Sequence, residues 1–175
     1  MSRRHRPAPE LFQAAVDGDR SALARLLSLI ERGDDDARVI GRLAYPLSGS
    51  GYTVGLTGAP GAGKSTLTSS LIGLLRAQDL EIAVLAIDPS SPFTGGAILG
   101  DRVRMQDHAT DPGVFIRSMA TRGHLGGLSL ATPEAVRVLD AIGRKWILVE
   151  TVGVGQVEVE VAGKADTTVV VVNPG

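Results

Sequence analysis

The segment from Gly58 to Ser65 places the tightest limit on what this chain can fold into. It reads G-A-P-G-A-G-K-S, which matches the pattern G-x-x-x-x-G-K-[ST]. An apolar run, residues 52–57, precedes it, and a stretch with leucines at helical spacing, residues 64–77, follows it. The glycines allow successive backbone N–H groups to point at phosphate oxygens, and a helix N-terminus adds its positive end. The pattern therefore predicts a strand, a phosphate-binding loop and a helix in succession.

Two side chains of this loop have specific chemistry. Lys64 supplies a positive charge for the β- and γ-phosphate oxygens of a nucleotide, and the Ser65 hydroxyl is suited to ligate Mg²⁺. A glycine-rich turn with a surface lysine is the weaker alternative. The predicted nucleotide-binding residues here are Gly58, Ala59, Pro60, Gly61, Ala62, Gly63, Lys64, Ser65 and Thr66.

Short apolar runs alternate with helical stretches after residue 51. Runs such as Ala83–Ile87 lack polar alternation, as expected when helices cover both faces of a parallel sheet. The expected strands are 52–57, 82–87, 114–118, 146–150 and 168–172, and the expected helices are 64–77, 101–109 and 132–142. Thr132 and Pro133 look like the N-cap and first residue of the third helix. We predict an α/β P-loop NTPase fold with a mostly parallel sheet and helices on both faces.

The first part of the chain has a different pattern. Leu23, Leu26, Leu27 and Ile30 form one apolar stripe of a helix, and Gly33 is placed to end it. Shorter helices are expected before and after this one. We therefore predict a small helical region with a linker over residues 1–50, followed by a P-loop domain over residues 51–175.

A second candidate segment is the apolar run that ends in Glu150. A strand that ends in an acid, with a glycine three residues later, is typical of sites that place a carboxylate near Mg²⁺ and an N–H near a γ-phosphate. Here these residues are Glu150 and Gly153. Because glutamate is longer than the usual aspartate, it indicates contact with the ion through water, or a different strand position. An exposed strand-end glutamate is the alternative.

Asp88 and Asp101 flank a segment rich in glycine and serine. The run before Asp88 should deliver it to the carboxyl end of the sheet, where ligands of open α/β sheets bind. Asp101 begins an expected helix, so an N-cap role and a metal-shell role are both open. Acids in such a segment are typical of a switch that Mg²⁺ and γ-phosphate order. The predicted magnesium ligands are Ser65, Asp88, Asp101 and Glu150.

Composition excludes several classes of protein. The 175 residues contain no cysteine, which excludes disulfides and cysteine metal sites and favours a cytoplasmic protein. The formal net charge of −1 provides no overall attraction to nucleic acid or to anionic membranes. No apolar run has the 18 or so residues that a membrane helix requires. We expect neither a nucleic-acid nor a membrane partner.

Three segments together resemble one family. The loop G-A-P-G-A-G-K-S-T, the stretch A-I-D-P-S-S-P-F-T-G-G-A-I-L-G-D-R-V-R-M and the segment V-E-T-V-G-V-G-Q are similar to those of the methylmalonyl-CoA mutase-associated GTPases, the MeaB/ArgK proteins. The resemblance covers about residues 52–175. It implies a GTPase that uses Mg²⁺, binds GTP and GDP, and serves as a chaperone for an adenosylcobalamin-dependent mutase by gating cofactor loading and protecting the enzyme. It also implies a homodimer when full length.

The resemblance assigns roles to individual residues. Residues 88–101 and 150–157 correspond to switches I and II, and the three acids named above correspond to the family's metal-shell acids. Gln156 stands where a side chain could orient the attacking water, although a solvent-facing glutamine is the alternative. The catalytic residues implied are Lys64, Glu150 and Gln156.

The family's guanine-reading N-K-x-D motif would lie beyond Gly175, so this chain is expected to be a C-terminally truncated form, and guanine specificity rests on the resemblance. Other functions stay open at this point. A P-loop kinase would transfer the γ-phosphoryl group to an acceptor, and a binding module would use nucleotide without hydrolysis. A metal chaperone is disfavoured because the three histidines are scattered.

Overall fold

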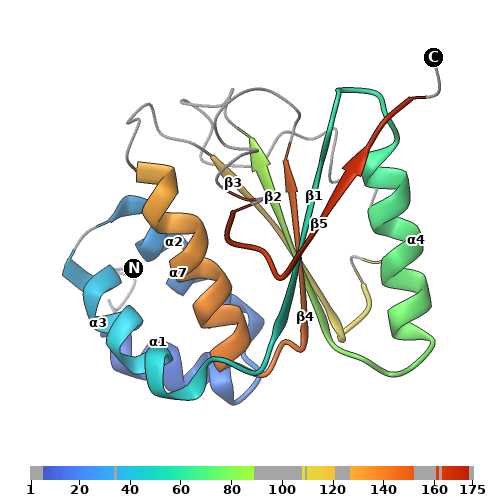
Figure 1. The fold of residues 1–175 in the computed structure, drawn as a ribbon. Coiled ribbons are helices and arrows are strands. Elements are labelled where there is room, and N and C mark those ends of the chain that lie inside the picture. Colours follow the sequence, from blue (N-terminus) through green and yellow to red (C-terminus); the bar gives the residue numbers. More distant parts are fainter. Residues whose placement is uncertain are drawn as a thin grey trace, which may run out of the picture.

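A computed structural model of the chain describes residues 6–33, 35–88, 108, 110–120, 127–151, 161 and 163–173. Within these ranges, helices lie on both faces of one sheet (Figure 1). The elements in chain order are α1 (Ala8–Val16), α2 (Arg20–Arg32), α3 (Asp35–Ala44), the 3₁₀-helix η1 (Tyr45–Leu47), β1 (Tyr52–Gly58), α4 (Lys64–Arg76), β2 (Ile82–Asp88), β3 (Val114–Ala120), α7 (Gly127–Ala141), β4 (Trp146–Thr151) and β5 (Thr167–Val171).

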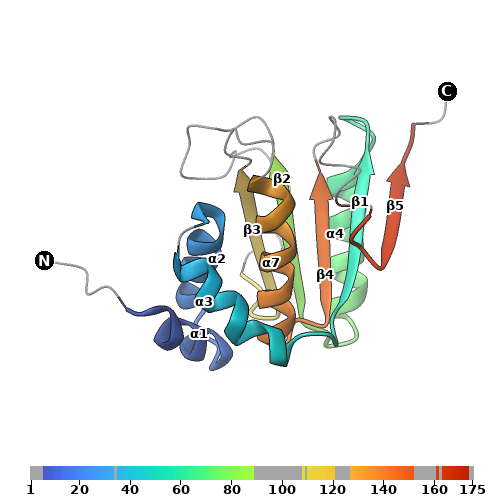
Figure 2. The ribbon, with the colours of Figure 1, turned by 60° about the vertical axis from the view of Figure 1, so that its left-hand side comes forward.

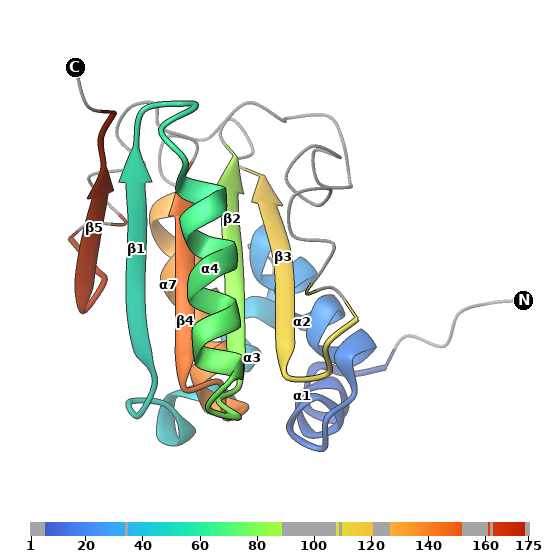
Figure 3. The ribbon, with the colours of Figure 1, turned by 90° about the vertical axis from the view of Figure 1, so that its right-hand side faces the viewer.

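The sheet has the strand order β3-β2-β4-β1-β5, and all of its neighbouring strands are parallel (Figure 3). The predicted α/β fold is therefore confirmed, and each predicted strand agrees with the observed one to within two residues. In the register, Glu150 lies beside Leu56 of β1 and Ala86 of β2. The central strand β4 thus carries Glu150 to the carboxyl end of the sheet, next to the end of β1.

Alternate residues of the strands face two different helical layers. Val54, Leu56, Val84 and Leu148 belong to a core with Ile72 of α4 on one face. On the other face, α7 and the N-terminal helices cover the sheet (Figure 2). The buried strand residues of that second face include Ala83, Leu85, Ile87, Phe115, Ile147 and Val149. The continuous apolar runs in the sequence follow from this burial on both faces.

The N-terminal helices form as the sequence predicts. Asp19 caps α2 by accepting N–H bonds from Ser21 and Ala22, and Gly33 ends the helix at φ +67°. The predicted stripe that includes Leu26 is buried, and its core is continuous with one face of the sheet. The division at residue 50 thus coincides with a change from helices to strands, and the two-domain assignment stays a prediction.

The predicted start of the helix expected over residues 132–142 is wrong. Helix α7 begins at Gly127, so Thr132 and Pro133 lie in its second turn rather than at its N-terminus. Thr132 Oγ1 is buried and makes no hydrogen bond within the part of the chain that the structure describes, whereas a capping hydroxyl would accept a backbone N–H. A Thr-Pro pair does not by itself mark a helix start. Proline fixes φ at a helical value, so it also fits an early turn inside a helix where the missing backbone N–H is tolerated.

Asp140 of α7 holds the linker between η1 and β1. Its buried carboxylate accepts the N–H groups of Gly49 and Gly51, the latter at 2.7 Å. We expect Asp140→Ala to lower the free energy of unfolding by about 2 kcal/mol, because two backbone donors lose their acceptor. Urea denaturation measures this, and Asp140→Asn, which keeps one acceptor oxygen, should lose less. Equal stability of the alanine variant and wild type would contradict the assignment.

Asp111, before β3, is paired with Arg76 at the end of α4. The Arg76 Nε bond to Oδ2, at 2.9 Å, and then the Gly113 N–H lower the pKa of Asp111 below its usual value. A lowered folded-state pKa stabilises the fold above the usual value of about 3.9, and this stabilisation is lost as the pH falls through the folded-state pKa. We expect the melting temperature of Asp111→Asn to depend less on pH between about 5 and 2 than that of wild type. Parallel pH curves would contradict this.

Strand β5 forms one edge of the sheet, and Val170 is among its exposed residues. None of the helices in the described part of the chain combines the length and apolar character needed to span a membrane.

Candidate functional site

The loop between β1 and α4 has the backbone of a phosphate-binding loop. Gly58, Gly61 and Gly63 have φ values of +133°, +80° and +96°, a region that side chains disfavour. At Gly58 a Cβ would also lie 2.1 Å from the Val171 carbonyl oxygen of β5. Position 58 therefore requires glycine both for its backbone conformation and for its close approach to β5. Helix α4 starts at Lys64, so its N-terminus lies at the loop.

Lys64 is buried beneath this loop, with 7% of its surface exposed. Its ammonium group donates to the Gly58 carbonyl at 2.7 Å and the Ala59 carbonyl at 2.9 Å. Pro60 and Gly61, at the top of the loop, are exposed. The loop backbone therefore encloses the Lys64 ammonium group, while the outer side of the loop is accessible to a ligand.

Ser65 and Glu150 meet at the base of the loop. The Ser65 hydroxyl donates to Glu150 Oε1 at 2.6 Å, although 85 residues separate the two. Glu150 is 6% exposed, so it is not the solvent-facing strand-end acid of the alternative reading. Within the described ranges, no basic side chain lies at ion-pair distance from it. A buried carboxylate with hydroxyl donors alone is costly, and a cation would relieve that cost.

The sequence analysis missed one residue of this site, Thr68. Its hydroxyl lies 2.9 Å from Glu150 Oε2 and 3.0 Å from the Lys64 carbonyl oxygen. The spacing from Lys64 and Ser65 was the available signal, because residues three and four apart lie on one face of a helix. The Glu150 carboxylate is thus held at both oxygens by α4.

The residues present fit a magnesium ion bound together with a nucleotide. Mg²⁺ prefers oxygen ligands and is usually held by one or two protein oxygens, phosphates and water. Ser65 and Glu150 supply such oxygens. In the described ranges no three Asp, Glu, His or Cys side chains gather at a metal site. The oxygens of Ser65 and Glu150 fit an ion whose other ligands would be nucleotide phosphates and water.

Of the predicted site residues outside the loop other than Glu150, the structure describes the backbone of one, Asp88. Asp88 ends β2, and its neighbour Ile87 pairs with Thr151 of β4, so its backbone lies at the same end of the sheet as Glu150. Asp101, Gly153 and Gln156 lie outside the described residues, as do most of the two expected switches and nearly all of the expected helix 101–109.

Comparison with known proteins agrees with this geometry. The sequence model of the family described as "Methylmalonyl Co-A mutase-associated GTPase MeaB" matches residues 23–175. The chain belongs to the MeaB family. This confirms the resemblance found in the three sequence segments, all of which lie within the matched residues.

Individual relatives span this MeaB-family chain almost completely. A Pyrococcus abyssi protein with a provisional GTPase name is 61% identical over 166 residues, which are 95% of this chain and 51% of that protein. The fused isobutyryl-CoA mutase of Cupriavidus metallidurans is 39% identical over 173 residues, which are 97% of this chain and 16% of that protein. In the crystal structure of an LAO/AO transport system kinase, 49% of the solved chain matches 94% of this one, with 30% identity and a TM-score of 0.73. The chain thus spans about half the length of several of its relatives.

Proposed function

We propose that this MeaB-family protein binds guanine nucleotides with Mg²⁺ at the loop of residues 58–66 and hydrolyses GTP. The observation that carries the proposal is the hydrogen bond from Ser65 to the buried Glu150, beside the loop that encloses Lys64. Names of its relatives support GTP as the substrate. Asp88, Asp101, Gly153 and Gln156 remain proposed contributors to metal binding, γ-phosphate contact and water orientation.

The residues of this chain would act by position and charge. Lys64 exchanges its contacts with the Gly58 and Ala59 carbonyls for phosphate oxygens, and the loop N–H groups bind the same oxygens. Glu150 keeps the Ser65 hydroxyl oriented at the metal position. A bound Mg²⁺ would neutralise the negative charge that develops on the phosphate oxygens. Because no strong general base lies among these residues, we expect slow intrinsic turnover.

We further propose an adenosylcobalamin-dependent mutase as the partner, with the protein as its chaperone, gating cofactor loading and protecting the enzyme. Two findings support this: the family description names methylmalonyl-CoA mutase, and one relative joins a matching segment to a chain named as a mutase. A homodimer of the full-length protein and a cytoplasmic location belong to the same proposal.

One observation favours a second function. The LAO/AO transport system kinase is named as a kinase, so transfer of the γ-phosphoryl group to an acceptor is the competing reaction. The two reactions differ in product, because a hydrolase releases inorganic phosphate from GTP whereas a kinase needs an acceptor that becomes phosphorylated.

Incubation with γ-labelled GTP or ATP and Mg²⁺, with and without an adenosylcobalamin-dependent mutase, tests these proposals. We expect inorganic phosphate from GTP only, faster with the mutase. Labelled protein or label on another acceptor would favour the kinase. Equal turnover of ATP would contradict guanine specificity, and the absence of any effect of the mutase would contradict the partner.

A further inference from the structure

Thr68 is fully buried one turn into α4, where nothing in the loop motif requires a hydroxyl. Its Oγ1 has two acceptors in reach, Glu150 Oε2 at 2.9 Å and the Lys64 carbonyl oxygen at 3.0 Å. A threonine within a helix commonly bonds the carbonyl four residues earlier, and that bond alone would be an ordinary local feature. The carboxylate contact is what distinguishes this threonine.

A single hydroxyl proton has to serve these two acceptors. A carboxylate is the stronger acceptor because charge-assisted hydrogen bonds are shorter and stronger than neutral ones. The Lys64 carbonyl has another available donor in the helix, since a backbone N–H four residues later closes the usual turn. The hydrogen bond from Thr68 therefore stabilises the Glu150 carboxylate more than it stabilises the Lys64 carbonyl group.

Together, Ser65 and Thr68 hold the Glu150 carboxylate at both oxygens. Ser65 contacts Oε1 and Thr68 contacts Oε2, from the same side of α4. Ser65 is also the predicted metal ligand, and its oxygen can face Mg²⁺ through a lone pair while its proton stays on Glu150 Oε1. Thr68 holds the other carboxylate oxygen, Oε2.

We propose that Thr68 is a positioning residue, which orients the Glu150 carboxylate at the magnesium position while Ser65 binds the ion. This rests on the proposed function of the site. Thr68 itself touches neither nucleotide nor metal; it acts through the carboxylate that it fixes.

The test compares Thr68→Val, which has nearly the same shape without the hydroxyl, with Thr68→Ser, which keeps the hydroxyl and loses a methyl group. The affinity for GDP is measured by calorimetry in EDTA and again in Mg²⁺. We expect both variants to bind GDP in EDTA within about twofold of wild type. Thr68→Val should lose about tenfold or more of the Mg²⁺ affinity of the nucleotide complex, as metal sites do when a supporting contact is removed, whereas Thr68→Ser should retain it.

Thermal unfolding of each variant separates this from a purely structural role. Both variants should be less stable than wild type, Thr68→Ser because it leaves a void and Thr68→Val because it leaves Glu150 Oε2 without its donor, yet only Thr68→Val should lose Mg²⁺ affinity. If Thr68→Ser loses as much Mg²⁺ affinity as Thr68→Val, or if Thr68→Val keeps the wild-type value, the inference is overturned and the proposed function stands. If wild type binds no guanine nucleotide at all, the proposed function fails, and this inference fails with it. Thr167→Val is the matched control. It removes an exposed threonine hydroxyl on β5 and should change neither the Mg²⁺ affinity of the nucleotide complex nor the melting temperature.

Discussion

Lys64→Ala is expected to reduce GDP and GTP affinity by about 10²- to 10³-fold while the fold is retained. Removing one partner of a buried, hydrogen-bonded charge pair costs about 3–4 kcal/mol, and each 1.4 kcal/mol is tenfold in affinity. The loss of stability should be small because, among the described residues, the ammonium bonds two loop carbonyls, those of Gly58 and Ala59. Calorimetric titration with GDP measures the affinity, and circular dichroism reports the fold.

Lys145→Ala is the matched control for this variant. Lys145 is an exposed lysine directly before β4, at the opposite end of the sheet from the loop, and its ammonium donates to Ser50 Oγ at 2.8 Å. Its removal changes the net charge by the same amount and should leave GDP affinity unchanged. Equal affinity of Lys64→Ala and wild type would show that the lysine does not face the phosphates.

Glu150→Gln is expected to leave nucleotide binding in EDTA intact and to lower Mg²⁺-dependent hydrolysis by about 10- to 100-fold. The amide keeps the size of the side chain and can still bond Ser65 and Thr68, so the fold should persist. It lacks the negative charge that a metal ion needs nearby. Phosphate release at a series of Mg²⁺ concentrations measures the effect.

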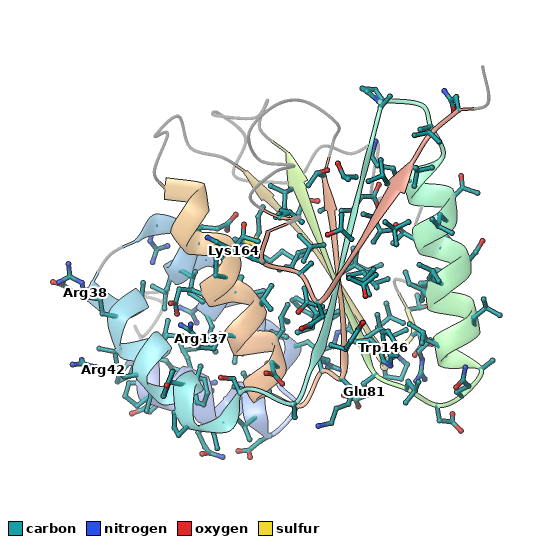
Figure 4. All side chains as sticks on the ribbon, in the orientation of Figure 1. Arg38, Arg42, Glu81, Arg137, Trp146 and Lys164 are labelled. Atoms are coloured by element: carbon teal, nitrogen blue, oxygen red, sulfur yellow. The ribbon has the colours of Figure 1, made fainter. Side chains whose placement is uncertain are left out.

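Glu81→Gln provides the comparison. Glu81 lies just before β2 and pairs with Arg144, at the end of the sheet where the strands begin, and Figure 4 shows it far from the loop end. The same chemical change there should leave hydrolysis at its wild-type rate. Full hydrolysis by Glu150→Gln, with the wild-type Mg²⁺ dependence, would exclude Glu150 from the metal site.

The sheet and most helices were predictable because local pattern and tertiary burial agree. Runs such as 82–87 are apolar at every position, and the structure buries them between α4 on one side and α7 with the N-terminal helices on the other. The start of α7 was not predictable from Thr132 and Pro133, because the same residues occur within an early helical turn. The joining of the Leu26 stripe to the sheet core is a tertiary contact that no local pattern encodes.

The site divides in the same way. Lys64 and Ser65 could be placed because the loop motif fixes them within a few residues, and Glu150 because it ends an apolar strand. The direct Ser65–Glu150 bond spans 85 residues, and it depends on β4 lying next to β1. In the sequence, Thr68 looks like an ordinary threonine within a helix. Its contact with the Glu150 carboxylate depends on the order of the strands, which no local pattern encodes.

Mg²⁺-dependent binding of GTP at the loop of residues 58–66 is the central claim, and calorimetry with a non-hydrolysable GTP analogue tests it most directly. We expect one site per chain, tighter binding in Mg²⁺ than in EDTA, and loss of binding in Lys64→Ala. An analogue that binds equally well to Lys64→Ala, or that shows no binding to wild type with or without Mg²⁺, would contradict the claim.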